Sequence, residues 1–465
     1  MNFFKRSILC IAFMPLLFTL ISCGKNDDVY TPDGRLILTY WEKWTGFEAD
    51  AMIKVVDEFN KSQDKLFVRF ISVSQIDRKL LIATAGGDPP DIAGIWTWAI
   101  NIYADKNAIM PIDNFVNEAG ISENDYIPFF YKLCQHRGHI WALPTTPAST
   151  ALHWNKRLFR EVGLDPEKPP TTIRELDEFA EKMTLYKLKS GKVISYTELM
   201  KLPDYEGLMN DADIIQMGFL PYEPGWWNWA WGYWFGGELW NGEDRITVHS
   251  PENVSALEWI RSYTTKFGKY QVERFFSGMA GQFASSRNAF LCGKIAMEMQ
   301  GAWMYNFIRK YSPGLDWGAA PFPGKDDSLN NISVAEGDVL TIPKGAKHPK
   351  ESFEFIKFVN EQKNMELLCE GHRKFSPLRN VSDDFYIKNP HPYIKVFRSL
   401  AEDTRVVTTP ATGIWNEYSR EFNVCFDKVK NLEMTPDEAL ESLQKRMQIS
   451  LDRENRRLKR RGRGR

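Results

Sequence analysis

Apolar and polar residues follow two different periods between residues 35 and 96. "RLILTY" (35–40), "LFVRFISV" (66–73) and "PDIAGIW" (90–96) are short apolar runs typical of buried strands. Between them, "FEADAMIKVVDEFNKS" (47–62) and "QIDRKLLIATAGG" (75–87) carry apolar residues at helical spacing, and glycines close the second. Strand, helix, strand, helix, strand predicts an α/β fold with a parallel sheet covered on both faces.

A second α/β region follows from residue 150. Its pattern predicts strands at 150–155, 246–249, 294–303, 316–324 and from 338, and helices at 171–189, 251–268, 280–293 and 349–362. No internal repeat or long apolar segment interrupts it.

The parallel sheet also predicts where a ligand binds. In such sheets the ligand lies beyond the carboxyl ends of the strands. This rule brings together Tyr40, Trp41, Glu42 and Trp44 after the first strand, and Asp91, Trp96 and Trp98 around the third.

The segment "GWWNWAWGYW" (225–234) concentrates five tryptophans in ten residues. So much flat apolar surface has three interpretations: ordinary core, a membrane interface, or a platform on which a ligand stacks. Alternate indoles of such a segment must face the core, so we expect part of it to pack inward and part to face a cleft.

Length and charge exclude several classes of protein. A chain of 465 residues favours two domains, and 43% hydrophobic with 26% charged residues is typical of a soluble globular protein. The net charge of −1 gives no general argument for nucleic-acid binding. Residues 451–465 form a basic tail, interpreted as a solvated charge run or as an attachment to anionic lipid or cell-wall polymer.

The N-terminus resembles a bacterial lipoprotein signal. A basic start, a short apolar run and "LISC" match the lipobox, which implies a signal peptide at 1–22, cleavage before Cys23 and acylation of Cys23. The alternative is an ordinary signal peptide with an incidental cysteine. Residues 23–35 then form a tether, and the protein is anchored by its lipid in the cell envelope, on the periplasmic or extracytoplasmic side of the membrane.

The other cysteines, Cys134, Cys292, Cys369 and Cys425, are scattered, so up to two disulfides and free thiols both stay open. No CxxC or HExxH spacing indicates a metal, and no cofactor is expected.

Five motifs in order resemble family 1 extracellular solute-binding proteins, the sugar-binding receptors of bacterial ABC importers. They are "GGDPPDIAGIW", "RGHIWALPTTPASTALHWNKRLFREVGLDPEKPPTTIRELDEFAEKM", "MGFLPYEPGWWNWAWGYWFGGELW", "FLCGKIAMEMQGAW" and "TIPKGAKHPKESFEFIKFV". The resemblance covers about 36–429. It departs from the family at "PPTTIREL" and at "VAEGDVL", and the second departure lies near the expected ligand.

The resemblance implies a two-lobed, periplasmic-binding-protein-like fold, each lobe a sheet flanked by helices. We expect interlobe crossings at 143–152, 296–301 and 337–343. Lobe one is then 36–143 and 302–337, and lobe two is 152–296 and 346–450. The implied partners are a carbohydrate ligand and permease subunits. The chain has no Walker-type loop, so the ATPase is a separate polypeptide. We expect a monomer.

A sugar needs a partner for each buried hydroxyl and flat apolar surfaces for its C–H faces. Acidic residues and tryptophans supply both. The candidate ligand-binding residues are Trp41, Glu42, Trp44, Asp91, Trp96, Trp229, Trp231, Trp234, Trp303, Glu336 and Trp415.

Two other functions remain open at this point. A secreted carbohydrate-active hydrolase also needs stacked tryptophans, plus a carboxylate pair that Glu42, Asp91, Glu238 or Glu336 would supply. The same fold could instead bind a non-sugar solute such as a polyamine or a glycerophosphodiester.

Overall fold

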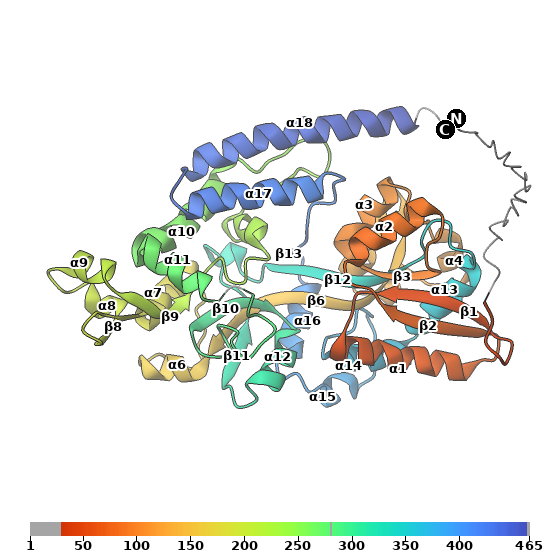
Figure 1. Ribbon diagram of the computed structural model, residues 1–465, viewed down its shortest axis with the longest axis horizontal. Helices are drawn as coiled ribbons and strands as arrows, with labels where there is room; N and C mark the ends of the chain where they lie inside the picture. The colour runs from red at the N-terminus through yellow and green to blue at the C-terminus, as the bar shows by residue number, and fades with distance from the viewer. Residues whose placement is uncertain (1–28, 280, 463–465) are drawn as a thin grey trace, which may run out of the picture.

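A computed structural model describes residues 29–279 and 281–462 (Figure 1). Among these residues, eleven strands form one continuous sheet. Its main order is β2 (Leu66–Ser72), β1 (Leu36–Glu42), β3 (Ile92–Trp96), β12 (Ser333–Thr341), β6 (Ala142–Asn155), β10 (Ile295–Gly301), β9 (Asp213–Phe219), β7 (Leu185–Lys187) and β8 (Val193–Ser195). In addition, β11 (Trp317–Ala320) pairs with β6, and β13 (Val406–Val407) pairs with β12.

Two strands, β6 and β12, join the two halves of the molecule. Between Ala142 and Ser149, β6 pairs antiparallel with β12, and between Thr150 and Asn155 it pairs with β10 and β11. All fourteen residues of β6 are buried. A single strand therefore belongs to the sheets of both halves, and Figure 1 shows β6 and β12 passing from one half to the other.

The first half confirms the parallel sheet expected from residues 35–96. Strand β1 pairs parallel with β2 and β3. Helices α1 (Gly46–Ser62), α13 (Pro349–Val359) and α14 (Gln362–His372) pack together over Leu38 and Tyr40. On the other face, α2 (Ile76–Gly86) and α3 (Ile100–Asp105) pack over Ala93 and Ile95 (Figure 1).

The second half packs helices around an aromatic core. Its larger elements are α7 (Ile173–Met183), η3 (Asn228–Phe235), α10 (Pro251–Phe267), α11 (Lys269–Ser277), α17 (Trp415–Lys430) and α18 (Pro436–Gly462). Trp231 and Trp234 are buried and lie 5.5 Å apart, centroid to centroid, with Phe322 in contact with both. Part of the tryptophan-rich segment is thus core.

The remaining elements are shorter. They are η1 (Thr97–Ala99), α4 (Asp113–Glu118), η2 (Glu123–Asp125), α5 (Pro128–Leu133), β4 (Gln135–His136), β5 (His139–Ile140), α6 (Lys156–Glu161), α8 (Tyr196–Leu199), α9 (Tyr205–Asn210), α12 (Met304–Tyr311), η4 (Asp327–Leu329), α15 (Phe385–Lys388) and α16 (Ile394–Glu402).

The expected assignment of segments to lobes needs correction. Residues 346–372 do not join lobe two, because Phe355, Ile356 and Leu368 of α13 and α14 share a core with α1. Residues 302–332 do not join lobe one, because β11 pairs with the end of β6 that also carries β10.

The crossings change accordingly. The crossings at β6 and β12 agree with two of the expected positions. The crossing expected at 296–301 is wrong, since β10 pairs with β9 and β6 and stays in the second half. The third passage instead follows α14, where residues 373–414 lead back to α17.

Three expected elements also differ. The helix expected at 171–189 ends at Met183, because Tyr186 is buried on β7, which forms a hairpin with β8. The helix expected at 280–293 is absent from the described residues 281–293, where the Asn288 side chain accepts hydrogen bonds from the backbone of Phe290 and Leu291. Residues 246–249 form no strand, since the amide of Ile246 donates to a glutamine of α18.

Residues 1–28, with the expected signal peptide and Cys23, lie outside the described residues. No helix among the described residues is long and apolar enough to cross a membrane. Cys134, Cys292, Cys369 and Cys425 are all free thiols. The basic tail expected at 451–465 is not a separate segment, because residues 451–462 continue α18.

The two kinds of tryptophan in the aromatic segment predict different stability effects. Trp234 is fully buried, so Trp234→Ala should lower the free energy of unfolding by about 3–5 kcal/mol. Trp226 is 46% exposed, and Trp226→Ala should cost less than about 1 kcal/mol. Urea unfolding of both variants measures the difference, and equal losses would contradict this division of the segment.

Candidate functional site

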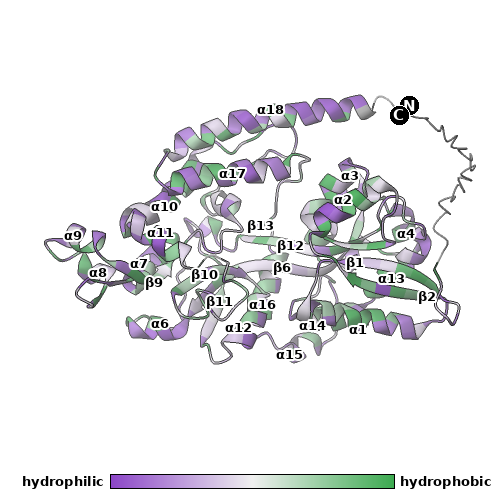
Figure 2. Cartoon of the chain, viewed as in Figure 1, coloured by the Kyte–Doolittle hydropathy of each residue, from purple (hydrophilic) through white to green (hydrophobic). Residues whose placement is uncertain are grey.

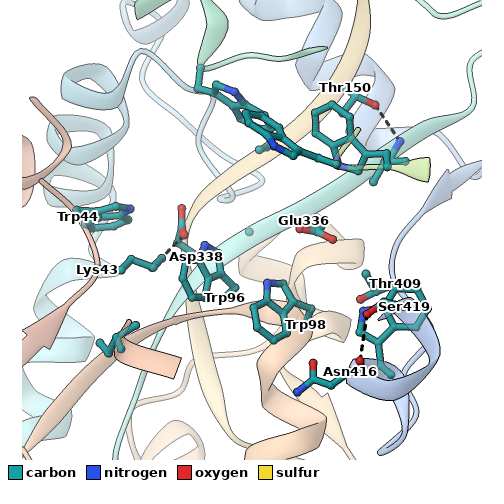
Figure 3. Close-up of a pocket in the computed structure, with 18 of the residues that line it drawn as sticks. Lys43, Trp44, Trp96, Trp98, Thr150, Glu336, Asp338, Thr409, Asn416 and Ser419 are labelled. Carbon is teal, nitrogen blue, oxygen red and sulfur yellow. Dashed lines mark hydrogen bonds and ion pairs between the residues drawn. The ribbon is translucent and has the colours of Figure 1, made fainter. Parts of the chain in front are cut away.

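A cavity of about 690 Å³ lies between the two halves, and both halves line it (Figure 3). The first half contributes Lys43, Trp44, Glu48, Trp96 and Trp98, and β6 and β12 contribute Thr150, Glu336 and Asp338. The residues after α14 contribute Lys374 and Thr409, and the second half contributes Trp226, Trp227, Trp229, Trp303, Trp415, Asn416, Ser419 and Asn423. Eight of these side chains are indoles.

The first-half indoles follow the carboxyl ends of β1 and β3. The rings of Trp96 and Trp98 stack with centroids 5.5 Å apart and planes 17° apart. The Lys43 ammonium lies 4.7 Å from the centroid of Trp44 and 5.1 Å from that of Trp96, within cation–π range. Parallel-strand ends therefore place three rings and one cation on the same side of the cavity, as the sheet rule predicts.

The second-half indoles come from three separate segments. Trp303 lies 6.3 Å from Trp226 and 5.9 Å from Trp227, centroid to centroid, and both pairs are tilted. Trp229 meets Trp415 of α17 edge to face at 5.5 Å. Neighbouring rings in this wall therefore meet at an angle and do not stack in parallel.

Glycine fixes the orientation of Trp303. The indole folds back over Gly301, so that a Cβ on Gly301 would lie only 2.1 Å from a ring carbon. Any larger residue at position 301 would displace the ring. The "GAW" spacing at the end of β10 therefore has a steric reason.

A charged group of residues closes the base of the cavity. Asp338 binds the ammonium of Lys43 at 3.0 Å and that of Lys374 at 3.3 Å, and Thr146 donates to it at 2.6 Å. Lys43 also binds Glu42 at 2.9 Å. Burial acts to raise the pKa of Asp338, but the two ammonium groups outweigh it and hold this pKa well below its usual range.

The carboxyl groups of Glu336 and Glu48 face the cavity and have few partners to offset their burial. Glu336 makes no side-chain hydrogen bond or ion pair among the described residues, and Figure 3 shows it between Trp98 and Thr150. Burial, and then the negative charge of Asp338, raise the pKa of Glu336 to about 7. The pKa of Glu48 is also raised, mainly by burial. These groups are available as hydrogen-bond partners for a ligand.

Six of the eleven candidate residues line the cavity: Trp44, Trp96, Trp229, Trp303, Glu336 and Trp415. The structure does not bring the other five to it. Trp231 and Trp234 lie in the core of the second half, and Trp41 packs against the core cluster on the face of the first-half sheet that α2 and α3 cover.

The two remaining candidates have structural partners. Glu42 is fully buried and accepts from the Tyr40 hydroxyl and from Lys43, so it supports the lysine behind the cavity and is not a free hydroxyl acceptor. The Glu42 carboxylate can occupy this position only because residue 94 is glycine: a Cβ on Gly94 would lie 1.7 Å from a carboxylate oxygen of Glu42. Asp91 accepts from the backbone and hydroxyl of Thr39, which joins β1 to the entry of β3.

Sequence reasoning missed several lining residues. Trp226 and Trp227 belong to the aromatic segment 225–234, and Lys43 lies between the candidates Glu42 and Trp44. The sequence could therefore have indicated these three residues. It could not have indicated Asp338 and Lys374, because their contact depends on β12 and the segment after α14 meeting in space. No group of residues that could hold a metal ion is present in the described part of the chain.

A family model for bacterial extracellular solute-binding proteins matches residues 48–366. A multiple sugar-binding protein of Streptococcus mutans is 22% identical over 78% of this chain and 80% of its own. The sn-glycerol-3-phosphate-binding periplasmic protein UgpB of Escherichia coli (strain K12) is 24% identical over 65% of this chain and 66% of its own.

Among solved structures, CpMnBP1 with mannotriose bound superposes with a TM-score of 0.73. It is 28% identical and covers 88% of this chain and 98% of its own. The two-lobed architecture is therefore shared with a protein that was solved with mannotriose bound.

The raised pKa of Glu336 predicts a pH effect on stability. Between its ordinary pKa of 4.5 and about 7, the folded protein keeps the proton that the unfolded chain loses, so this residue makes stability fall as pH rises through that window. Glu336→Gln should remove this contribution, up to about 3 kcal/mol. Thermal unfolding midpoints of both proteins should be measured from pH 4.5 to 8.5, and the midpoint of the variant should rise relative to that of the original chain as the pH increases. Midpoints that change in parallel with pH would contradict this.

The charged base of the cavity gives a second prediction. Asp338→Asn leaves two buried ammonium groups without their shared counter-ion and should cost about 3–5 kcal/mol of unfolding free energy. Asp316 pairs with Arg160 on the surface, and Asp316→Asn should cost less than about 1 kcal/mol. Urea unfolding at pH 7 compares the two variants. If Asp338→Asn loses as little unfolding free energy as Asp316→Asn, the ion pairs of Asp338 with Lys43 and Lys374 are not essential to stability.

Proposed function

The chain belongs to the bacterial extracellular solute-binding protein family, and from this premise we propose that it is the carbohydrate receptor of an ABC importer. It takes an oligosaccharide into the cavity between its halves and delivers it to a membrane permease that a separate ATPase drives. No bond of the sugar is broken.

The observation that carries the proposal is the composition of the cavity. Eight indoles from both halves face one space, and polar groups stand between them. Indole faces suit the C–H faces of sugar rings. Sugar hydroxyls, each of which must be paired on burial, can reach Glu336, Glu48, Asn416 and Asn423.

The number and spread of the indoles favour a ligand of more than one sugar ring. Trp96 and Trp98 belong to one half, while Trp229, Trp303 and Trp415 come from three segments of the other. A single ring cannot cover so many separate faces. The saccharide in the similar CpMnBP1 structure, mannotriose, is of this kind.

The charges of the cavity argue against a phosphate ligand such as the one that UgpB is named for. Among the described residues that line it there is no arginine, and three carboxyl groups, Glu48, Glu336 and Asp338, outnumber the two lysines. Both lysines are already bound to Asp338. Phosphate is recognised most strongly by free cations, above all arginine, so a neutral ligand fits these charges better.

A hydrolase would use its carboxyl groups differently. Glycoside hydrolysis needs a pair of carboxyl groups free to act as acid and as base or nucleophile. Asp338 is held by two ammonium groups and a hydroxyl, which leaves Glu48 and Glu336. We propose that these two bind hydroxyls, and that ligand binding stabilises a closed arrangement in which both halves touch the sugar.

Lipidation of Cys23 would complete this role by holding the receptor at the outer side of the cytoplasmic membrane, near its permease. A monomer suffices, because both walls of the cavity come from one chain.

Binding of saccharides tests the proposal. Mannobiose, mannotriose and maltotriose should be titrated calorimetrically, with glycerol 3-phosphate beside them. At least one saccharide should bind, and chromatography after long incubation with the protein should show that this saccharide is not cleaved. Binding of glycerol 3-phosphate alone, or release of shorter sugars, would refute the assignment.

The role of the indoles has its own test. Trp303→Ala should weaken binding of the saccharide at least about tenfold, because a ring that covers ligand is lost. Trp240, which is also half-buried but lies outside the cavity, is the matched control, and Trp240→Ala should leave the dissociation constant within about twofold. Equal effects of the two variants would place the ligand elsewhere.

A further inference from the structure

Helix α18 has an anchored part and a projecting part. Between Pro436 and Leu451, its apolar side chains Ala439, Leu440, Leu443, Met447 and Leu451 are buried in the core of the second half. The helix then continues without a break to Gly462, for three further turns. Figure 1 shows this part extending beyond α17, toward the first half.

The projecting part has two different faces. Glu454, Asn455 and Leu458 are half-buried, whereas Arg453, Arg456, Arg457 and Arg460 are exposed. The four arginines have the spacing i, i+3, i+4 and i+7, which places them on one side of a helix. We call these four residues the arginine face. Figure 2 shows this part of α18 as strongly hydrophilic.

Folding alone does not explain this concentration of charge. Like charges three and four residues apart destabilise a helix. The helix dipole favours cations at the C-terminus, but only within the last turn, and Arg453, Arg456 and Arg457 precede that turn. Only Arg457 has a partner, Glu454 at 3.2 Å, among the ion pairs of the described residues in this stretch.

The charge is also separated from the rest of the protein. Residues 453–465 carry eight cationic side chains and one carboxylate, so the other 452 residues of a chain with net charge −1 carry −8. An anionic surface would repel the body of the protein and attract this end of α18. The separation therefore gives the molecule a preferred orientation toward such a surface.

The projecting part is held in place by the body. A Cβ on Gly413 would lie 3.4 Å from a carboxylate oxygen of Glu454 and 3.2 Å from one of Asp105 in α3. The half-buried side of α18 thus lies against the segment before α17 and close to the first half. The arginines on the opposite side are therefore carried by one continuous helix that packs against the body of the protein.

We propose that the arginine face binds the anionic phospholipid headgroups of a membrane. A guanidinium binds phosphate through two parallel hydrogen bonds, and a row of four on a straight helix matches a flat layer of headgroups that can rearrange around it. Such a contact adds a second, electrostatic attachment to any lipid anchor and turns one side of the receptor toward the membrane.

Vesicle binding tests this directly. The chain from residue 24 to 465, without lipid, keeps every described element and is mixed with vesicles of phosphatidylcholine alone or with 30% phosphatidylglycerol. It should bind the anionic vesicles only, and 0.5 M NaCl should release it. The fourfold variant Arg453→Gln, Arg456→Gln, Arg457→Gln and Arg460→Gln should reduce the partition coefficient at least about 100-fold, since each cation contributes roughly fivefold.

The matched control removes the same charge from the opposite side of the molecule. Lys54, Lys61, Lys65 and Arg69 are exposed on α1, β2 and the turn between them, far from α18 in Figure 1. Their fourfold change to glutamine should retain more than about a third of the binding. Thermal unfolding midpoints confirm that both variants fold.

Three results would overturn the proposal. The first is equal binding of the two fourfold variants, which would mean that net charge alone matters. The second is binding to vesicles of phosphatidylcholine alone. The third is binding of the unchanged chain to poly(glycerol phosphate) but not to anionic vesicles, which would assign the arginine face to a cell-wall polymer. None of these depends on whether the cavity binds a sugar.

Discussion

The pairing of β6 with β12 is the constraint on which the rest of the structure depends. These two strands lie side by side between the halves, and every residue of β6 is buried. Because β6 continues from this pair into the second-half sheet, two of the three passages between the halves are paired strands. The register of β12 then places Glu336 in the cavity and Asp338 at its base.

The two halves contribute different chemistry to the same space. The first half offers indoles together with the Lys43 ammonium, which Glu42 and Asp338 hold from behind. The second half offers indoles and amides, with the rest of its aromatic segment packed as core. The segment 225–234 therefore serves both as core and as part of the cavity, because Trp229 faces the space while Trp231 and Trp234 face inward.

Local pattern was sufficient for much of the fold and for part of the site. The elements of residues 36–96 follow from hydrophobic period, and Trp44 and Trp96, which the sheet rule brings to the carboxyl ends of the strands, line the cavity. The rule failed for Trp41 and Asp91, since a strand end presents alternate residues to opposite faces and Asp91 is used to join strands. Segment-to-half assignments failed because they depend on which distant strand β11 and helices α13 and α14 meet. For the same reason Lys374 has no signal in the sequence around it.

The central claim is that aromatic side chains from both halves bind one saccharide between them. A crystal structure of the protein grown with mannotriose tests this most directly. The account predicts sugar rings within about 4 Å of indoles of both halves, such as Trp96 and Trp303, with a hydroxyl hydrogen-bonded to Glu336. Saccharide bound to only one half, or outside the cavity that Glu336 faces, would contradict it.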